Sequence, residues 1–579
     1  MLDHLIKGAT VVDGTGGAAF VADVGIRDGR IAVVAEVGKV GEEARSSEDA
    51  SGLVLAPGFV DPHTHYDAQL FWDPYATPSL NHGVTTVAGG NCGFTLAPLN
   101  PAQPGDADYT RRMMSRVEGM SLVALEEGAP WTWNSFGEYL GALDGRIAVN
   151  AGFMVGHCAL RRYVMGADAV GGQPTPEQLD RMVGLLKDAM EAGAWGLSTT
   201  QSSSHSDGDG EPVASRHAKP AELIALSNAV GEHEGTQIEA IVAGCLDQFS
   251  DDEIELFVEM SAAAGRPLNW NVLTIDASVP ERVPRQLEAS ERARKSGGRI
   301  VALTMPILTP MNMSLGTFCA LNLIPGWGEV LALPVEERIA KLRDPEVRGE
   351  MLRRADSKEA GVFRRLANFG RYVIGDTYSE ANEGLSGRVV KDIAAERGQE
   401  PFECLVEICA NDGLRTVLWP MPTDNDPDSW ALRAETWNHE DVMLGGSDAG
   451  AHLDRMCGAP YTTRFIGDCL RGRKLLGLEE AVKMLTDDPA QLFGLRERGR
   501  IQEGFHADLV LFDPETIDAG KATLVHDLPG DSPRLDSKAI GITAVWVNGV
   551  EAMRGDVVSG VVPGKVLRSG ADTRTVSTK

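Results

Sequence analysis

Residues 174–200 read PTPEQLDRMVGLLKDAMEAGAWGLSTT, which is an amphipathic helix followed directly by a short apolar strand. A helix is expected over 174–193, because Pro-Glu stands near its start, apolar residues recur at helical spacing and a glycine closes it. The same order returns in AELIALSNAVGEHEG at 221–235 and TQIEAIVAG at 236–244. Repeated alternation of helices and strands is typical of an α/β protein with a parallel sheet.

Six further apolar runs extend this pattern along the chain. They are GFVDPH at 58–63, GVTTVAGG at 83–90, IAVNAGFMVG at 147–156, RPLNWNVL at 266–273, GRIVALTMP at 298–306 and DVMLGGSD at 441–448. With GAWGLSTT and TQIEAIVAG they make eight strands separated by helices, which predict a (β/α)8 barrel, with an open doubly wound sheet as the alternative. We expect the barrel over residues 57–489. This span exceeds the roughly 250 residues of a minimal barrel, and a charged helical insertion at about 325–375, after the seventh strand, accounts for the surplus.

The two ends of the chain have a different sequence pattern, with short runs typical of β-strands. Residues 1–56 contain short β-branched runs separated by Asp13-Gly14 and Asp28-Gly29, and Asp-Gly between apolar runs is typical of a tight hairpin. Residues 490–579 contain similar runs with a turn at Asn548-Gly549. Because neither end has enough strands to close a core alone, we expect both to form one small β-sandwich domain.

Composition and charge exclude several classes of protein. The chain of 579 residues is 43% hydrophobic and 24% charged, close to a soluble globular average, which excludes collagen, coiled coil or long disorder as the dominant class. The sequence contains no run of 18 or more apolar residues, so it predicts no transmembrane helix. The N-terminal stretch MLDHLIKGATVVDGTGG lacks the apolar core of a signal peptide, so secretion is not expected. The net charge of −29 disfavours nucleic acid and anionic lipid as partners. Eight cysteines without a CxxC pair favour a reducing cytoplasm over a disulfide framework.

The first chemistry-bearing motif is His63-Thr64-His65, at the end of LVLAPGFVDPHTH. Residues two apart in a strand point to the same side, so both imidazoles can face one metal ion. The carboxyl end of a barrel strand is where active sites of this architecture lie. The alternative is a pair of structural histidines at a strand end.

Two further residues end predicted strands and carry metal chemistry. Asp448, in VMLGGSDAGAH, could complete a metal site and accept a proton from an activated water; the alternative is a turn or helix-cap aspartate. Cys92, in GVTTVAGGNCGFTLAP, could supply a thiolate ligand to zinc; the alternative is a buried thiol in a glycine-rich turn.

Two more histidines lie near the expected barrel mouth. His157, in FMVGHCALRR, ends the third strand, and its role as a ligand, a substrate contact or a structural group is open. His205 lies in the polar loop QSSSHSDGDGEP after the fourth strand, which would overhang the mouth.

Several of these segments together resemble the amidohydrolase superfamily. They are LAPGFVDPHTHYDAQ, GVTTVAGGNCGFTLAP, GAWGLSTT, GGSDAGAH and DDPAQLFGLRERGRIQEGFHADLVLFDP. The Asn-Cys-Gly after the second strand narrows the resemblance to the N-acyl-D-amino-acid deacylase (D-aminoacylase) family, over essentially the whole chain. The resemblance implies a metal-dependent hydrolase of a carbon–nitrogen bond other than a peptide bond, acting on a small-molecule amide such as an N-acyl-D-amino acid.

The resemblance also implies the roles of individual residues. His63 and His65 match the pair that binds the metal, and Cys92 matches the ligand that replaces the carboxylated lysine of hydantoinase-like relatives. Asp448 matches the aspartate that binds metal and acts as general base. If the substrate is an N-acyl amino acid, we also expect a cation to meet its carboxylate, first Arg455 and then Arg161 or Arg162; the alternative for all three is a surface arginine. A homo-oligomer is compatible with the sequence.

The chain departs from the family pattern at the fifth and sixth strands. Each normally carries one histidine, whereas TQIEAIVAG and RPLNWNVL contain none. Glu239 and Asn271 lie in these segments, and neither is a known substitute; His205 could supply a missing ligand. We therefore expect one zinc ion rather than two. The departure keeps two alternatives open: hydrolysis of another amide (a cyclic amide, a dipeptide or a xenobiotic amide), and a non-catalytic metal-binding barrel.

The insertion at about 325–375 is expected to act as a lid, because loops at the carboxyl face of a barrel often close over substrate. An apolar residue in it, such as Val362, Phe363 or Phe369, should then face the metal pocket. The alternatives are a contact between subunits and a solvated surface decoration.

Overall fold

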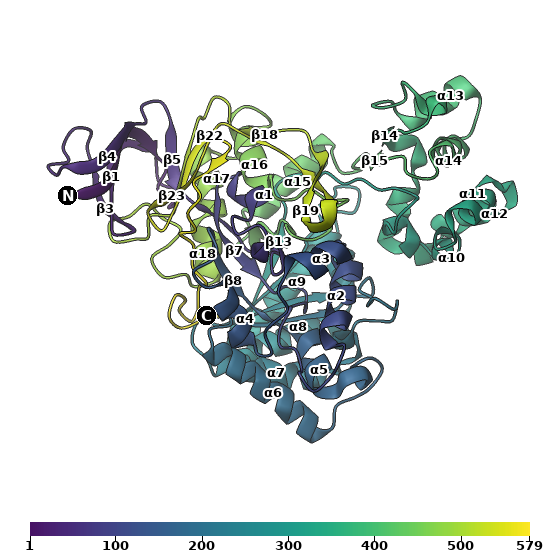
Figure 1. The fold of residues 1–579 in the computed structure, drawn as a ribbon, viewed down its shortest axis with the longest axis horizontal. Coiled ribbons are helices and arrows are strands. Elements are labelled where there is room, and N and C mark those ends of the chain that lie inside the picture. Colours follow the sequence, from purple (N-terminus) through teal and green to yellow (C-terminus); the bar gives the residue numbers. More distant parts are fainter. Residues whose placement is uncertain (579) are drawn as a thin grey trace. The chain divides into compact units, whose positions relative to one another are not determined.

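The computed structural model describes residues 1–578 (Figure 1). The chain forms two compact units. One contains Met1–Thr309 and the chain from Asp428 onward, and the other contains Pro310–Pro427. The candidate site lies in the first unit.

Parallel strands form the centre of the first unit. One sheet has the order β6-β7-β8, and the other has the order β16-β13-β12-β11-β10-β9. Their bounds are β6 Phe59–Asp61, β7 Val84–Gly89, β8 Asn150–Phe153, β9 Val155–Gly156, β10 Gly196–Gln201, β11 Gln237–Val242, β12 Pro267–Trp270, β13 Arg299–Thr304 and β16 Val442–Leu444. All eight predicted strand segments are present, and the third is divided at Met154 into β8 and β9. The predicted α/β class is confirmed.

Hydrogen bonds join the segments that follow the first and the last of these strands, β6 and β16. The amide of His65 donates to the carbonyl of Ala449 at 2.7 Å, and the amide of Asp448 donates to the carbonyl of His63 at 3.2 Å. These bonds link the segment after β6 to the segment after β16. Because all the strands pair in parallel, their carboxyl ends, with the residues that follow, lie at one end of the sheets.

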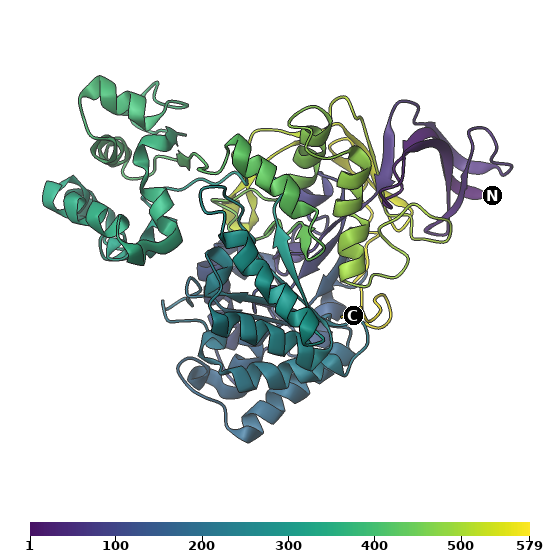
Figure 2. The ribbon, with the colours of Figure 1, turned by 180° about the vertical axis from the view of Figure 1, so that it is seen from behind.

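Helices alternate with the strands and lie on their outer side (Figure 2). The helix expected over 174–193 is α6 Pro176–Glu191, which begins with a capping box at Thr175. The other helices of this unit are α1 Thr77–Leu80, α2 Asp106–Val117, α3 Leu122–Gly128, α4 Phe136–Leu143, α5 His157–Met165, α7 Pro220–Gly231, α8 Asp251–Ala264, α9 Arg282–Lys295, α15 Pro427–Trp437, α16 Tyr461–Leu470, α17 Leu478–Leu485 and α18 Asp487–Leu492. Their apolar faces pack with the strands into one large core.

Strands from both ends of the chain pair in one nine-stranded sheet (Figure 1). Its members are β1 Leu2–Val11, β2 Phe20–Arg27, β3 Arg30–Ala35, β4 Ala44–Asp49, β5 Val54–Pro57, β17 Leu509–Phe512, β22 Ile542–Val547, β23 Val550–Arg554 and β24 Val557–Val558. The antiparallel pair β5–β17 joins the two ends of the chain. Short pairs follow β17, namely β18 Asp518–Ala519 with β21 Ala539–Ile540, and β19 Thr523–Leu528 with β20 Ser532–Asp536.

Two of the three predicted tight turns are confirmed. Asp28-Gly29 and Asn548-Gly549 each join two strands directly, and all four residues have the positive φ that such turns require. The expectation for Asp13-Gly14 is wrong, because the connection from β1 to β2 runs from Val12 to Ala19. A Cβ at Gly14 would collide with the carbonyl of Gly499, so in the long loop of this hairpin the glycine allows a close approach of two segments and does not form a tight turn.

The second unit is mainly helical. It contains α10 Trp327–Leu331, α11 Val335–Arg343, α12 Pro345–Ala355, α13 Val390–Arg397, α14 Pro401–Asn411 and the pair β14 Tyr372–Ile374 with β15 Leu418–Pro420. The segment 325–375 lies within it. Phe369 is buried in the unit's own core, with its ring centroid 4.3 Å from that of Phe402. Of the three residues offered for the metal pocket, Phe369 is therefore enclosed by its own unit. Within the described residues, no helix has both the length and the apolar character needed to cross a membrane.

Candidate functional site

The pair His63 and His65 follows β6 directly. Thr64 lies between them, and its amide and hydroxyl both donate to the carbonyl of Ala88, at 2.9 and 2.8 Å. This anchors Thr64 on β7. Both imidazoles are buried, and their ring centroids are 5.2 Å apart.

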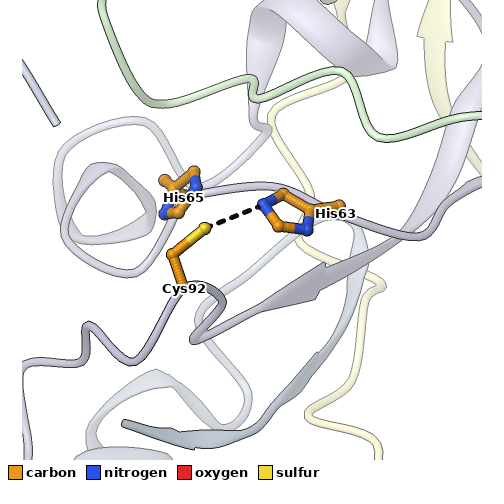
Figure 3. A group of neighbouring side chains, drawn as sticks. All are labelled: His63, His65 and Cys92. Atoms are coloured by element: carbon orange, nitrogen blue, oxygen red, sulfur yellow. Dashed lines mark hydrogen bonds between the residues drawn. The ribbon is translucent and has the colours of Figure 1, made fainter. Parts of the chain in front are cut away.

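Cys92 follows β7 and faces the two histidines (Figure 3). Its Sγ lies 3.5 Å from His63 Nε2. One nitrogen from each imidazole and the sulfur of Cys92 lie within 4.8 Å of one another. A Cβ at Gly90 would collide with the carbonyl of Met154, so the glycine lets this loop pack against the strand beside it.

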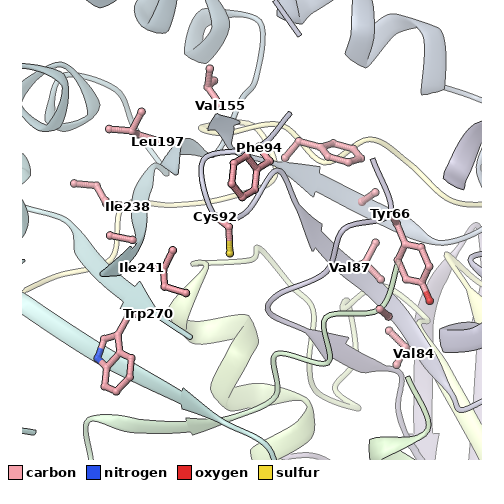
Figure 4. Close-up of a cluster of buried hydrophobic side chains, with 14 of the residues drawn as sticks. Tyr66, Val84, Val87, Cys92, Phe94, Val155, Leu197, Ile238, Ile241 and Trp270 are labelled. Carbon is pink, nitrogen blue, oxygen red and sulfur yellow. The ribbon is translucent and has the colours of Figure 1, made fainter. Parts of the chain in front are cut away.

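Apolar side chains surround the thiol of Cys92 (Figure 4). Phe94, Ile241 and Trp270 are among the buried residues of this cluster. Cys92 is therefore both a member of the apolar cluster and a neighbour of the imidazole of His63. Burial raises the pKa of Cys92, and the charge of Glu239 raises it further.

Asp448 follows β16 and approaches the same histidines. Its Oδ1 lies 3.3 Å from His63 Nε2 and 3.6 Å from His65 Nε2. The side chain of Asp448 is 25% exposed, whereas those of His63 and His65 are 0% and 2% exposed. Asp448 is therefore the group of this cluster that meets solvent. The amide of Asn271 donates to its Oδ1 at 3.4 Å.

Cys92 and Asp448 share an uncommon backbone conformation. Their φ angles are 54° and 55°, in the left-handed region that non-glycine residues rarely adopt. Such strain clusters at functional sites, where the surrounding structure holds it in place.

Two buried carboxylates that the sequence did not assign to the site lie beside it. Glu118, directly after α2, places Oε1 3.6 Å from His65 Nδ1. Glu239, on β11, accepts a hydrogen bond from the amide of Cys92 through Oε2 at 2.7 Å. Nothing in the sequence near Glu118 marks it, whereas Glu239 stood out only because it lies in a strand that lacks the expected histidine.

His452 is a third neighbour of the site. Burial lowers its pKa to about 4, although the nearby charge of Asp448 acts in the opposite direction. Its amide donates to the carbonyl of Glu118. The signal was present, because His452 closes the motif GGSDAGAH, four residues after Asp448.

The pKa values within the site diverge. Burial lowers the pKa of His63 to about 3. Burial acts the same way on His65, but the charges of Glu118 and Asp448 outweigh it and raise the pKa to about 9. Burial also raises the pKa of Asp448, yet the hydrogen bond to His65 and the charges of both histidines bring it well below its usual range.

This donor set suits a metal ion of the zinc type. Zinc is bound by imidazole nitrogen, thiolate sulfur and carboxylate oxygen, and His63, His65, Cys92 and Asp448 supply these atoms. A buried cluster of acidic groups is costly unless a cation compensates their charge. The residues present therefore fit the metal that the sequence predicts.

His205 and Arg455 lie close to the cluster. His205 Nδ1 lies 2.8 Å from Thr200 Oγ1, and burial lowers its pKa to about 3, with His452 and His65 adding to the effect. Arg455 pairs with Asp454 at 2.8 Å, and its guanidinium lies 3.1 Å from where a Cβ at Gly119 would stand.

His157, Arg161 and Arg162 lie in other contacts. His157 Nδ1 is 2.9 Å from Thr199 Oγ1, and its Nε2 is 2.9 Å from Glu222 Oε1. Arg161 donates to both oxygens of Glu222, at 2.7 and 2.6 Å. Arg162 stacks on the ring of Tyr109, with its Cζ 3.9 Å from the centroid. Both nitrogens of His157 are therefore engaged within the protein.

The model of the family described as "Amidohydrolase family" matches residues 47–553. The chain is 29% identical to the D-aminoacylase of Alcaligenes xylosoxydans xylosoxydans, over 98% of this chain and 97% of that protein. These matches confirm the resemblance that the sequence motifs indicate.

Two solved structures are similar over 98% of this chain and 100% of theirs. One is a D-aminoacylase described as having a binuclear metal centre, with one-metal activation and second-metal attenuation (27% identity, TM-score 0.65). The other is the N-acyl-D-glutamate deacylase of Bordetella bronchiseptica, in complex with zinc and a phosphonate that mimics the tetrahedral intermediate (26% identity, TM-score 0.66).

Proposed function

We propose that this chain, which belongs to the amidohydrolase family, is a zinc-dependent deacylase of N-acyl-D-amino acids. The observation that carries the proposal is the position of Asp448, whose Oδ1 lies 3.3 and 3.6 Å from the two histidines while its side chain reaches solvent. A group placed there can exchange a proton with an incoming substrate. The activities named for the similar D-aminoacylase and N-acyl-D-glutamate deacylase support the same substrate class.

The proposed architecture is a closed (β/α)8 barrel with a small β domain built from residues 1–56 and the chain from 490 onward. The parallel strands in chain order, and the bonds from His65 to Ala449 and from Asp448 to His63, support closure of the ring. The pairing of β5 with β17 supports the shared domain. The chemistry then lies at the carboxyl ends of the strands, as in other barrels.

We propose that one zinc ion is held by His63, His65, Cys92 and Asp448. The absence of histidine from the fifth and sixth strand segments supports one ion. When bound, the ion supplies Lewis acidity for activating water and polarising a carbonyl. The buried carboxylate of Glu118 orients His65 from the side opposite Asp448, because it lies against Nδ1 while Asp448 lies against Nε2.

Asp448 moves the proton in the proposed reaction. Its carboxylate accepts a proton from the attacking water, whose oxygen bonds to the acyl carbon. Asp448 then returns the proton to the leaving nitrogen as the carbon–nitrogen bond breaks, which gives a carboxylic acid and a free amino acid. The pKa of Asp448, held below its usual range, keeps the carboxylate ionised before the reaction.

Arg455 is the proposed partner of the substrate's carboxylate. It lies beside Gly119, next to Glu118, and its positive charge contributes to the lowered pKa of His452. His205, on the loop after β10, is proposed to contact the acyl or side-chain group. His157 is proposed to act indirectly: it contacts Thr199 of β10 and Glu222 and supports the strand before His205, instead of touching substrate.

A substrate screen tests the proposal. The purified chain, loaded with zinc, is assayed against matched N-acyl-D- and N-acyl-L-amino acids, cyclic amides and dipeptides. Faster turnover of the D-series is expected. Turnover of only a cyclic amide or a dipeptide would show that the chain hydrolyses another class of amide. Metal binding without turnover of any of these compounds would indicate a non-catalytic barrel.

A further inference from the structure

A buried carboxylate beside the thiol has one oxygen without a partner. Glu239 is fully buried, and in the described part of the chain its Oε1 has no hydrogen-bond partner. Its other oxygen accepts the amide of Cys92 at 2.7 Å. An ionised carboxylate buried in this way is costly unless a cation meets it.

The strand fixes where this carboxylate lies. Glu239 is the third residue of β11, and it pairs in register with Ser198 of β10 and Asn269 of β12. Ile238 and Ala240, its neighbours in the strand, belong to the apolar core. Because successive side chains alternate between the two faces of a strand, Glu239 projects to the opposite face, toward the loop of Cys92.

Glu239 is also tied to the group of metal-binding atoms. Cys92 connects them, because its amide binds Glu239 while its Sγ lies 3.5 Å from His63 Nε2. The carboxylate of Glu239 therefore lies against the residue that carries the thiol of the cluster. Carboxylate oxygen is an accepted zinc ligand beside imidazole and thiolate.

We propose that Glu239 is a ligand of the zinc ion, supplying from β11 a carboxylate where this chain has no histidine. The inference rests on the metal site proposed at His63, His65 and Cys92. It makes Glu239 part of the coordination of the ion, in addition to its role as the acceptor for the amide of Cys92.

The variant Glu239→Gln separates these two roles. Glutamine keeps an oxygen that can accept the amide of Cys92, but it loses the charge and is a much poorer zinc ligand. The full-length protein is stripped of metal and titrated with Zn²⁺ against a chromophoric chelator. Loss of groups that only support ligands typically weakens metal binding by about 10–100-fold, so loss of a ligand should raise the Kd by at least that factor.

Cobalt gives a readout that is independent of activity. Co²⁺ bound to the wild type should show a thiolate-to-metal charge-transfer band, which reports Cys92. Glu239→Gln should keep this band but require more cobalt, with changed d–d bands. The matched control is Asp67→Asn, which removes another buried carboxylate, one that accepts the amide of Gly90 at 3.1 Å. It should change the Kd far less.

The outcomes are distinguishable. A wild type that binds no zinc would overturn the metal site and the proposed function together. A wild type that binds zinc, with Glu239→Gln giving the same Kd and the same cobalt bands, would overturn only the role of Glu239. If Glu239→Gln fails to fold, Glu239→Asp replaces it: the carboxylate is one methylene shorter, so a raised Kd is expected, and an unchanged Kd and spectrum would overturn the inference.

Discussion

Two buried clusters of histidine and carboxylate follow parallel strands of the same unit, and they differ in how their polar atoms are satisfied. Around His157, both ring nitrogens have partners, and Glu222 is neutralised by Arg161. Around His63, the atoms His63 Nδ1 and Glu239 Oε1 have no hydrogen-bond partner among residues 1–578. In one place the imidazole and the carboxylate therefore have all their nitrogen and oxygen atoms engaged, and in the other an imidazole nitrogen and a carboxylate oxygen stay open.

This difference assigns the two clusters to different tasks. The carboxylate of Glu222 and the imidazole of His157 have no atom left to offer a metal ion, and removing Glu222 leaves the charge of Arg161 uncompensated. A buried group of imidazole, thiol and carboxylate with open positions is suited to a cation. Changes in the cluster of His63 should therefore affect metal and turnover, and changes in the cluster of His157 should affect stability.

The largest effect is expected from Asp448→Asn. Asparagine keeps the size of the side chain but cannot hold a proton at neutral pH, and general base catalysis is typically worth about 10²–10⁴-fold. We expect kcat to fall by at least that factor with the fold retained, as measured by steady-state kinetics and circular dichroism. Asp441→Asn, at the other end of β16, is the control and should keep turnover. Near-normal turnover in Asp448→Asn would make Asp448 only a turn-forming residue.

The next effect is expected on stability, from Glu222→Ala. The change leaves Arg161 buried without its partner, which typically costs about 3–5 kcal/mol. Denaturant unfolding should show this loss, while zinc bound per folded chain stays as in the wild type. Glu232→Ala removes a surface pair with Lys187 and should cost less than about 1 kcal/mol. Loss of zinc with unchanged stability in Glu222→Ala would reverse the assignment of the two clusters.

The same variant has a predicted pH dependence. Burial raises the pKa of Glu222, but the hydrogen bond from His157 and the charge of Arg161 outweigh it and hold the pKa below 4.5. A lowered folded-state pKa stabilises the fold above the unfolded pKa, and this contribution is lost as the pH falls through the folded pKa. The difference in unfolding free energy between wild type and Glu222→Ala should therefore be full above pH 4.5 and shrink below it. A difference that grows on acidification would contradict the ion pair.

The smallest effect is expected from Arg455→Ala. A hydrogen bond to a charged group is worth about 1.5–3 kcal/mol, which corresponds to roughly 10–150-fold in kcat/KM. Most of this should appear as a raised KM for the N-acyl-amino acid. Arg162→Ala, which removes the guanidinium stacked on Tyr109, is the control and should leave KM unchanged. A raised KM in Arg162→Ala alone would move the carboxylate site to α5.

The sequence predicted much of the fold from local patterns. All eight strand segments and the helix at α6 follow from apolar periodicity and capping residues, which act over a few neighbouring positions. The turn at Asp28-Gly29 was predicted for the same reason. Asp13-Gly14 has the same residue types but serves a contact with Gly499, hundreds of positions away, which no local pattern encodes.

The candidate site divides in the same way between the sequence and the tertiary structure. His63, His65, Cys92 and Asp448 each end a strand or follow one closely, so their chemistry and position could be read from the chain itself. Glu118 and Glu239 could not be assigned in advance, because the sequence does not say which buried carboxylate will contact the imidazole of His65 or the backbone amide of Cys92. Only packing decided that His157 contacts Glu222, which Arg161 neutralises, while His63 Nδ1 and Glu239 Oε1 keep no hydrogen-bond partner among the described residues. Residue types and strand ends are local properties of the sequence, whereas the partners of a buried polar atom depend on which distant segments the fold brings within hydrogen-bonding distance.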